Sequence, residues 1–117
     1  MAEAFVLNRS LILDRLGGDE EIFVMMLDMY LQDVDSNCAA LGSALASGDA
    51  PTLQREAHTV KGLLATFSDD AGAADAYLIE QKSRLGNVDG LDEAVVALQA
   101  RLHEVAKVLA AELNPAG

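Results

Sequence analysis

The sequence predicts an all-α protein, an antiparallel four-helix bundle with a short extra helix at its N-terminal end. No segment shows the sustained alternation of apolar and polar residues that a half-buried strand requires. The long segments instead repeat apolar residues every three or four positions, which is the period of a helix buried on one face. Short polar breaks separate these segments, so consecutive helices can run antiparallel and cover one another's apolar sides.

The first two helices are separated by the sequence GGDEE. A short helix is expected around Asn8 to Leu16, and Asp19 is placed to cap a second helix that runs from about Glu20 to Ala46. The residues expected to stack along one side of the second helix are Phe23, Leu27, Tyr30, Val34, Cys38 or Leu41, and Leu45. Ile22, Met25, Met26 and Met29 widen this apolar surface. We expect the first helix to cover part of it and any remainder to form an exposed patch.

The remaining helices also begin at polar residues. Asp49 is expected to cap the third helix, with Pro51 in its first turn, and the sequence SDD at 68–70 to begin the fourth. The fourth helix is predicted to continue through Ala74, Leu78 and Leu85, and Asp89 to cap the fifth. The fifth helix has the most regular stripe, and Asn114 and Pro115 should stop it. That stripe comprises Leu91, Val95, Leu98, Leu102, Val105 and Leu109.

Length and charge restrict the classes of function. The 117 residues predict a single domain spanning 1–117 and, because the chain supplies its own four helices, a monomer. The net charge of −11 would repel nucleic acids and anionic lipids, so neither is an expected partner. No stretch approaches the roughly 18 apolar residues of a membrane span, and the start MAEAF does not resemble a secretory signal, which predicts a cytoplasmic protein.

The third helix carries a polar face with unusual residues. Leu53, Ala57, Val60, Leu64 and Phe67 define its buried side, and the helical turn angle places His58 roughly 140° away from the centre of that stripe. Gln54, Lys61, Gly62 and Ala65 lie on the same side as His58. An unperturbed imidazole, with a pKa of about 6.5, is mostly neutral in the cytoplasm, so its ring nitrogen can act as a nucleophile, for which phosphorus is a plausible electrophile.

Gly62 has no evident structural reason to be a glycine. A glycine inside a helix costs roughly 0.5–1 kcal/mol relative to alanine, and Gly62 points away from the apolar stripe, where close helix packing would otherwise explain it. We therefore expect an outside partner to approach closely at this position.

The run Ala57, His58, Val60, Lys61 and Gly62 resembles the motif of the histidine phosphotransfer (HPt) domain family, here in a stand-alone HPt protein. The resemblance implies that His58 accepts a phosphoryl group from an aspartyl phosphate of a receiver domain and passes it to another. Lys61 would help to hold the phosphoryl group, and Gly62 would leave room for the receiver. From their positions on the helix, we expect Gln54, Arg55 and Ala65 to contact the receiver. The implied partners are receiver domains of response regulators or of a hybrid sensor kinase.

The resemblance implies no cofactor or metal bound by this chain, because the receiver supplies Mg²⁺. The sequence departs from the family after the Lys-Gly pair, where LLATFSDD replaces the usual small residues and glycine. We expect this departure to affect the turn between the third and fourth helices, and partner preference, rather than the position of His58.

Other functions are less well supported. The chain lacks a Walker-type phosphate loop, so autonomous kinase activity is not expected. Neither His103 nor Cys38 has another His or Cys at the spacing of a metal-binding motif. We therefore interpret His103 as a boundary or surface histidine and Cys38 as a small buried hydrophobe. The alternative function is a helical adaptor that binds a partner through the apolar patch of Met25, Met26 and Met29.

Overall fold

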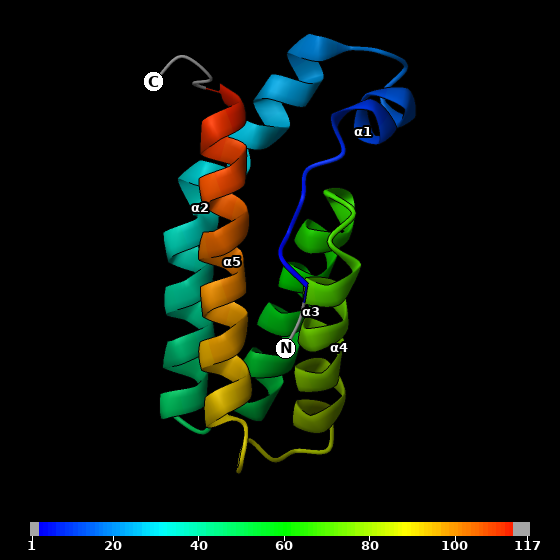
Figure 1. Cartoon of the computed structure of the whole chain (residues 1–117). Coiled ribbons are helices and arrows are strands. Elements are labelled where there is room, and N and C mark those ends of the chain that lie inside the picture. Colours follow the sequence, from blue (N-terminus) through cyan, green and yellow to red (C-terminus); the bar gives the residue numbers. More distant parts are fainter. Residues whose placement is uncertain (1–2, 114–117) are drawn as a thin grey trace.

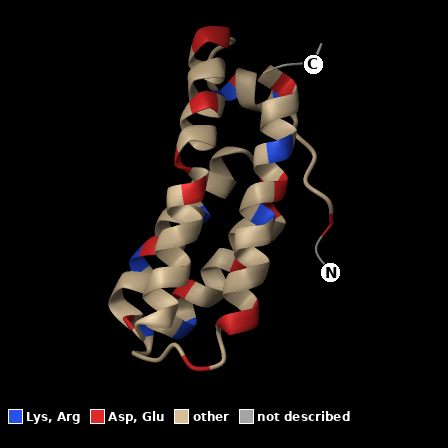
Figure 2. Cartoon of the chain, turned by 90° about the vertical axis from the view of Figure 1, so that its left-hand side faces the viewer, with Lys and Arg blue, Asp and Glu red and all other residues tan. Residues whose placement is uncertain are grey.

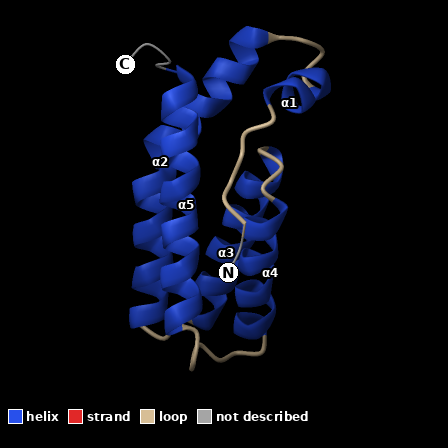
Figure 3. Ribbon diagram, viewed as in Figure 1, coloured by secondary structure: helices blue, strands red, loops and turns tan. Residues whose placement is uncertain are grey.

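A computed structural model describes residues 3–113, which form five helices and no strand (Figure 3). The helices are α1 (Arg9–Arg15), α2 (Glu20–Ala46), α3 (Ala50–Thr66), α4 (Asp70–Arg84) and α5 (Asp92–Leu113). The helices α2 to α5 form an antiparallel bundle, with α2 beside α5 and α3 beside α4 (Figure 1). The predicted fold class is confirmed. The expected stop at Asn114 and Pro115 lies outside the described residues.

The core lies between the apolar stripes of the four long helices. All five apolar residues predicted to face inward from α3 are buried, as is the whole predicted stripe of α5. From α2 the predicted residues are also buried except Leu45, which is half-buried. The rings of Tyr30 and Phe67 meet edge to face at 5.6 Å, which connects α2 to the end of α3. The buried directions of three helices therefore follow from their helical period.

Aspartates cap three of the long helices. Asp19 accepts a hydrogen bond from the backbone N–H of Ile22, and Asp49 accepts one from Thr52, so both predicted caps are confirmed. Asp69, within the predicted SDD break, caps α4 through the N–H of Gly72.

The predicted cap of α5 is wrong. Asp89 lies in the turn before the helix, which begins only at Asp92. Gly90, with a φ of 78°, separates the two, and Leu91 occupies the position before the first helical residue. The Leu91 side chain is buried and its carbonyl accepts the N–H of Val95. Core packing at Leu91 therefore fixes the start of this helix, and no capping side chain is found there.

The apolar residues used to predict the extent of α4 do not lie on its buried face. The helix passes through Ala74 and Leu78 and is capped at Leu85, but these three residues are exposed. Its buried residues are Gly72, Ala76, Ile79 and Ser83. Most of these are small, and a side chain at Gly72 would collide with the Asp69 carboxylate and approach Leu64 of α3. Close packing of α3 against α4 selects small residues here in place of large apolar ones.

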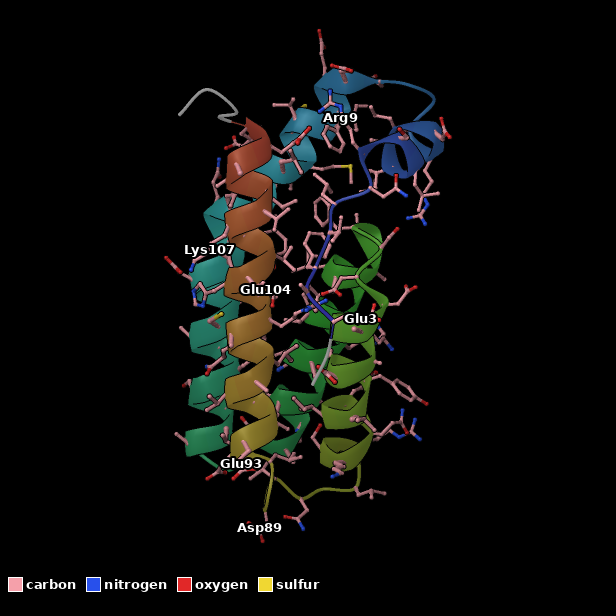
Figure 4. All side chains as sticks on the ribbon, in the orientation of Figure 1. Glu3, Arg9, Asp89, Glu93, Glu104 and Lys107 are labelled. Atoms are coloured by element: carbon pink, nitrogen blue, oxygen red, sulfur yellow. The ribbon has the colours of Figure 1, made fainter. Side chains whose placement is uncertain are left out.

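The first helix lies beside the N-terminal end of α2 (Figure 1). Arg9, labelled in Figure 4, joins α1 to α2 and α5. Its guanidinium pairs with Glu20 of α2 and Glu112 of α5 and lies 4.9 Å from the ring centre of Phe23. Met25 and Met29 remain 61% and 59% exposed, so they belong to the exposed remainder that was expected beside this helix. A seven-residue helix held at the end of α2 leaves this surface open.

The segment before α1 runs along the bundle between α5 and the α3–α4 pair (Figures 1 and 4). Phe5 is buried, and its N–H donates to Glu104 at 2.7 Å. Arg101 of α5 donates to the Glu3 carbonyl and forms two hydrogen bonds with Asp69 at 2.6 and 2.8 Å. Arg101 and Asp69 are 7% and 3% exposed, so a buried ion pair links α5, the α3–α4 turn and the N-terminal segment.

Acidic positions are scattered over the helices seen in Figure 2, with fewer basic positions among them. Within residues 3–113, no helix combines the length and the apolar character that spanning a bilayer would require.

Candidate functional site

His58 lies on the exposed side of α3. Its side chain is 65% exposed, whereas its neighbours Ala57 and Val60 are fully buried. The helical period places the buried residues on one side and His58 on the other. The imidazole therefore lies where a second protein can reach it, as the spacing predicts.

Glu80 of α4 connects His58 to Lys61. One carboxylate oxygen lies 2.9 Å from Nδ1 of His58, and the other accepts a hydrogen bond from Nζ of Lys61 at 2.7 Å. The Glu80 side chain is only 13% exposed, because α4 packs closely along α3 and the carboxylate lies in the seam between the two helices. The two ring nitrogens thus differ: Nδ1 faces a carboxylate, and no partner for Nε2 is found within residues 3–113.

The bridge keeps Glu80 ionised. Its pKa is lowered from the ordinary value, chiefly by the hydrogen bond from Lys61 and further by the hydrogen bond with His58, while partial burial acts in the opposite direction. Lys61 is half-buried and lies 5.2 Å from the ring centre of Tyr77, which adds a cation–π contact. Lys61 is therefore held in place on α3 rather than free to move in solvent.

Gly62 leaves an open space beside the imidazole. A Cβ atom at this position would have no atom within 4 Å, apart from its own helix, and Gly62 does not have a positive φ. Neither packing nor backbone geometry requires a glycine here. The local effect of Gly62 is therefore free space on the surface of α3.

The other residues expected to contact a partner surround His58. Ala65 and Arg55 are exposed and Gln54 is half-buried. Ala65 lies on the same side as His58, while the Arg55 guanidinium turns back toward the hydroxyl of Thr52 at 3.4 Å. The structure therefore gathers all six predicted site residues on one surface of α3.

An apolar hollow of about 140 Å³ adjoins this surface. Thr66, one turn beyond Gly62, lies on its rim beside Leu63, and Met26, Met29 and Tyr30 of α2 form much of the rest. The hollow thus brings Met26 and Met29 of α2 next to Thr66 of α3, one turn beyond Gly62, which the sequence did not indicate.

The two remaining reactive side chains lie elsewhere. Cys38 is buried, and burial raises the pKa of its thiol. His103 is 52% exposed, with Nε2 at 3.2 Å from Asp35 and Nδ1 at 3.9 Å from the Cys38 sulfur. Among residues 3–113, no group of three or more His, Cys, Asp or Glu side chains is placed to hold a metal ion.

Two solved structures have the same fold as this chain. The HPT domain of an Hpt sensor hybrid histidine kinase from Shewanella superposes with a TM-score of 0.80 at 20% identity, covering 93% of this chain and 94% of that one. The histidine-containing phosphotransfer protein B of Pseudomonas aeruginosa PAO1 gives 0.84 at 20% identity, covering 98% and 100%. A comparison with curated protein sequences gives no match.

The family model of the Hpt domain matches residues 25–108. That range contains the exposed histidine on α3, the bridge to α4 and most of the bundle. Fold, motif and family model agree, and the chain belongs to the Hpt domain family, the phosphotransfer proteins of two-component signalling.

Proposed function

We propose that His58 carries a phosphoryl group between receiver domains, accepting it from an aspartyl phosphate and passing it to the aspartate of another receiver. The observation that carries this proposal is the exposed imidazole, 65% open to solvent, with one ring nitrogen free of partners within residues 3–113. An exposed neutral imidazole is a competent nucleophile toward phosphorus.

The transfer needs little from this chain beyond correct placement. A ring nitrogen forms the N–P bond while the P–O bond to the donor aspartate breaks, and the electron pair leaves with the carboxylate. Phosphoryl transfer depends mainly on alignment and on charge neutralisation. We propose that the receiver supplies Mg²⁺ for this neutralisation and that Lys61, one turn from His58, adds a positive charge from this chain.

The face around His58 suits a receiver as partner. From Ser36 to Ser68 the charged residues are Asp49, Arg55, Glu56 and Lys61, which sum to zero in a chain of net charge −11. This segment is therefore the least repulsive part of the chain for another acidic protein, and the acidic residues that adjoin it on this side are Glu80 beside His58 and Asp33 at the hollow. The hollow beside Thr66 can take one apolar side chain of a receiver helix, and Gly62 allows the backbone of α3 to be approached.

The net charge argues against nucleic acids and anionic membranes as partners. Because the four long helices bury their stripes against one another, we also propose that the chain acts as a monomer.

The test is phosphoryl transfer from isolated phosphorylated receivers. We expect this chain to acquire a label that is labile to acid and stable to base, as phosphohistidine is. The variant His58→Gln should lose the label, and His103→Gln should keep it, because His103 is equally a solvent-exposed histidine but lies on α5. Circular dichroism should show the same helical content for all three proteins.

Two outcomes would contradict the proposal. Labelling that persists in His58→Gln would assign the phosphoryl group to another residue. A complete lack of labelling by every receiver of the source organism would favour the alternative, an adaptor that binds through Met25, Met26 and Met29 without chemistry.

A further inference from the structure

The fourth helix has an exposed apolar stripe that the bundle does not use. Leu78 and Leu85 are 57% and 83% exposed, and Ala74 and Ala71 continue their line toward the start of α4. These positions follow one another at intervals of three, four and seven residues, so they share one side of the helix. A helix that already buries another side within its own bundle can use such a stripe to pack against a further helix.

The stripe lies on the opposite side of α4 from the phosphotransfer site. Successive residues of a helix turn by about 100°, so Leu78 lies roughly 160° around α4 from Glu80, the residue that contacts His58. A protein bound over Leu78 would therefore leave the imidazole accessible.

Two hollows lie on this side of the molecule, and apolar atoms form most of their lining. The first, of about 150 Å³, lies between α4 and α5, where Leu78 and Ile79 face Ala94. The second, of about 340 Å³, lies on the surface of α5 beside Val96, which is 62% exposed. Ala97 lines both hollows, so the two form one surface, which we call the α4–α5 face.

The charged residues that line the α4–α5 face are mainly acidic. Asp75, Asp92 and Glu93 contribute three carboxylates, against one ammonium group from Lys82. Glu93 lies near the beginning of α5 in Figure 4. A cationic partner is therefore attracted, whereas a second copy of this chain would bring the same excess of negative charge against the face.

We propose that the α4–α5 face is a second docking surface, which binds an amphipathic helix of a partner protein. The helix that fits has leucine-like residues at intervals of three and four, which enter the hollows on either side of Ala97, and lysine or arginine on its flanks. The basic flanks would face Asp75 of α4 and Glu93 of α5. The inference goes beyond phosphoryl transfer, because none of these residues belongs to the site around His58.

The first experiment locates a model helix on the protein. The probe is a synthetic peptide of about 18 residues, long enough for five helical turns, built from Leu, Ala and Lys with its leucines on one side. In a titration of ¹⁵N-labelled protein, we expect the peptide to shift the amide signals around Leu78, Val96 and Ala97 and to leave those around His58 unchanged. A peptide of the same composition in shuffled order, and one with Glu in place of Lys, should each bind at least roughly tenfold more weakly.

The variant Leu78→Glu separates docking from simple charge attraction. It removes the central apolar side chain and adds a negative charge, so docking predicts weaker binding of the basic peptide and charge attraction predicts tighter binding. We expect a loss of affinity of about tenfold or more, the size that follows from one buried leucine.

The matched control is Val24→Glu. Val24 is 45% exposed on α2 and lines neither hollow, so the same charge added there should leave the affinity unchanged or slightly raised. Circular dichroism should show the same helical content for both variants and the wild type, because both side chains are exposed.

Several results would overturn the inference. These are a lack of saturable binding of the basic peptide, binding to Leu78→Glu as tight as to the wild type, and shifts that centre on the hollow beside Thr66 or spread over the acidic residues of all helices. Dimerisation of the wild type in sedimentation equilibrium that Leu78→Glu abolishes would make a second copy, and not a basic helix, the occupant of the face.

The outcome is independent of whether receivers phosphorylate His58, since a chain that no receiver labels can still bind the peptide. Where a receiver does label the chain, Leu78→Glu should be labelled as fast as the wild type. Loss of labelling in this folded variant would place Leu78 in the receiver site and contradict a separate surface.

Discussion

Two residues beside His58 act in opposite ways. Glu80 fixes the imidazole from the side of α4, and Gly62 leaves the other side empty. Glu80 limits the orientations of the ring. Gly62 leaves space that a partner can enter. A side chain that must react with a group on another protein needs both properties, because the reacting atoms have to meet at a defined distance and direction.

Replacing Gly62 with glutamine should block transfer without unfolding the protein. The added side chain projects into space that is empty in the structure, so helix stability should stay the same or rise by about 0.5 kcal/mol, while a docked receiver would meet its bulk. Gly62→Ala is the matched control, since its single methyl group should preserve most of the transfer rate. Transfer from a receiver that is as fast in Gly62→Gln as in the wild type would contradict close approach at this position.

The ion pair of Glu80 with Lys61 should appear in the pH dependence of stability. The pKa of Glu80 is lowered in the folded state, so its contribution is present above the ordinary glutamate pKa of about 4.3 and is lost as the pH falls through the folded value. Glu80→Gln should therefore be less stable than the wild type at pH 7, by about 1 kcal/mol.

The loss from Glu80→Gln should shrink as the pH falls below the ordinary glutamate pKa of about 4.3 and through the lower pKa of the folded state, because the wild-type carboxyl group becomes neutral over that window. Urea unfolding at pH 7 and pH 3.5 measures both differences, with Asp75→Asn as the control, because Asp75 is an acidic residue of the same helix that is paired with neither His58 nor Lys61. An equal loss at the two pH values would show that the effect does not come from the carboxylate charge.

Helical spacing was sufficient to place His58, Lys61 and Gly62 on one surface, because all three lie on one continuous helix. Glu80 could not be found in this way. It is one of 19 acidic residues, and its role depends on the rotation of α4 about its axis against α3. Exposed Leu78 made that rotation hard to infer from apolar residues alone.

At the scale of elements, the turn from α3 to α4 carries local strain. Ser68 has a φ of 62°, a conformation that glycine adopts most readily after a helix. Its hydroxyl oxygen is buried and has no hydrogen-bond partner within the described residues. The turn ends the segment 63–70 in which the sequence departs from the usual family pattern, and this segment follows His58, Lys61 and Gly62 but includes Ala65.

Ser68→Gly should stabilise the protein. Relief of the left-handed backbone is worth about 1–2 kcal/mol, and the greater freedom of glycine in the unfolded chain removes about 0.5–1 kcal/mol of that gain. A net gain of about 0.5–1 kcal/mol should raise Tm by a few degrees, as measured by circular dichroism. Ser68→Ala removes the hydroxyl alone and keeps the strain. Equal melting temperatures for the two variants would show that the backbone conformation is not the source of the gain.

The bounds of the helices were predictable from the sequence only in part. The range of α2 was predicted correctly because Asp19 supplies a local cap and a glycine follows Ala46 by two residues. The start of α5 was not, because the burial of Leu91 overrides the more favourable capping residue Asp89. Local chemistry sets a helix end only where tertiary packing does not compete with it.

Across the whole molecule, one buried ion pair holds together parts of the chain that are distant in sequence. Arg101 contacts Asp69 and the Glu3 carbonyl, which lie 32 and 98 positions away. No periodic pattern could indicate this, since Arg101 stands within the apolar stripe of α5 next to Leu102. The sequence therefore predicted the bundle but not how its N-terminal segment is attached.

Arg101→Met should destabilise the protein by about 3–5 kcal/mol, because it leaves the Asp69 carboxylate buried and unpaired. The double variant Asp69→Asn/Arg101→Met should recover part of this loss, since asparagine removes the charge and still caps α4. Urea unfolding of the wild type, of Asp69→Asn, of Arg101→Met and of the double variant measures the coupling between the two residues. Equal losses in the single and double variants would show that the unpaired charge is not the cause.

The open position of His58 also affects how long a phosphoryl group would stay on it. The ring is exposed and Nε2 has no hydrogen-bond partner among the described residues, so a phosphoryl group held there would be in contact with water whenever no receiver is docked. Its lifetime would then be set by spontaneous hydrolysis of the N–P bond rather than by shielding from the protein. The duration of the stored signal would thus depend on how soon the next receiver arrives, and so on the cellular concentration of that receiver.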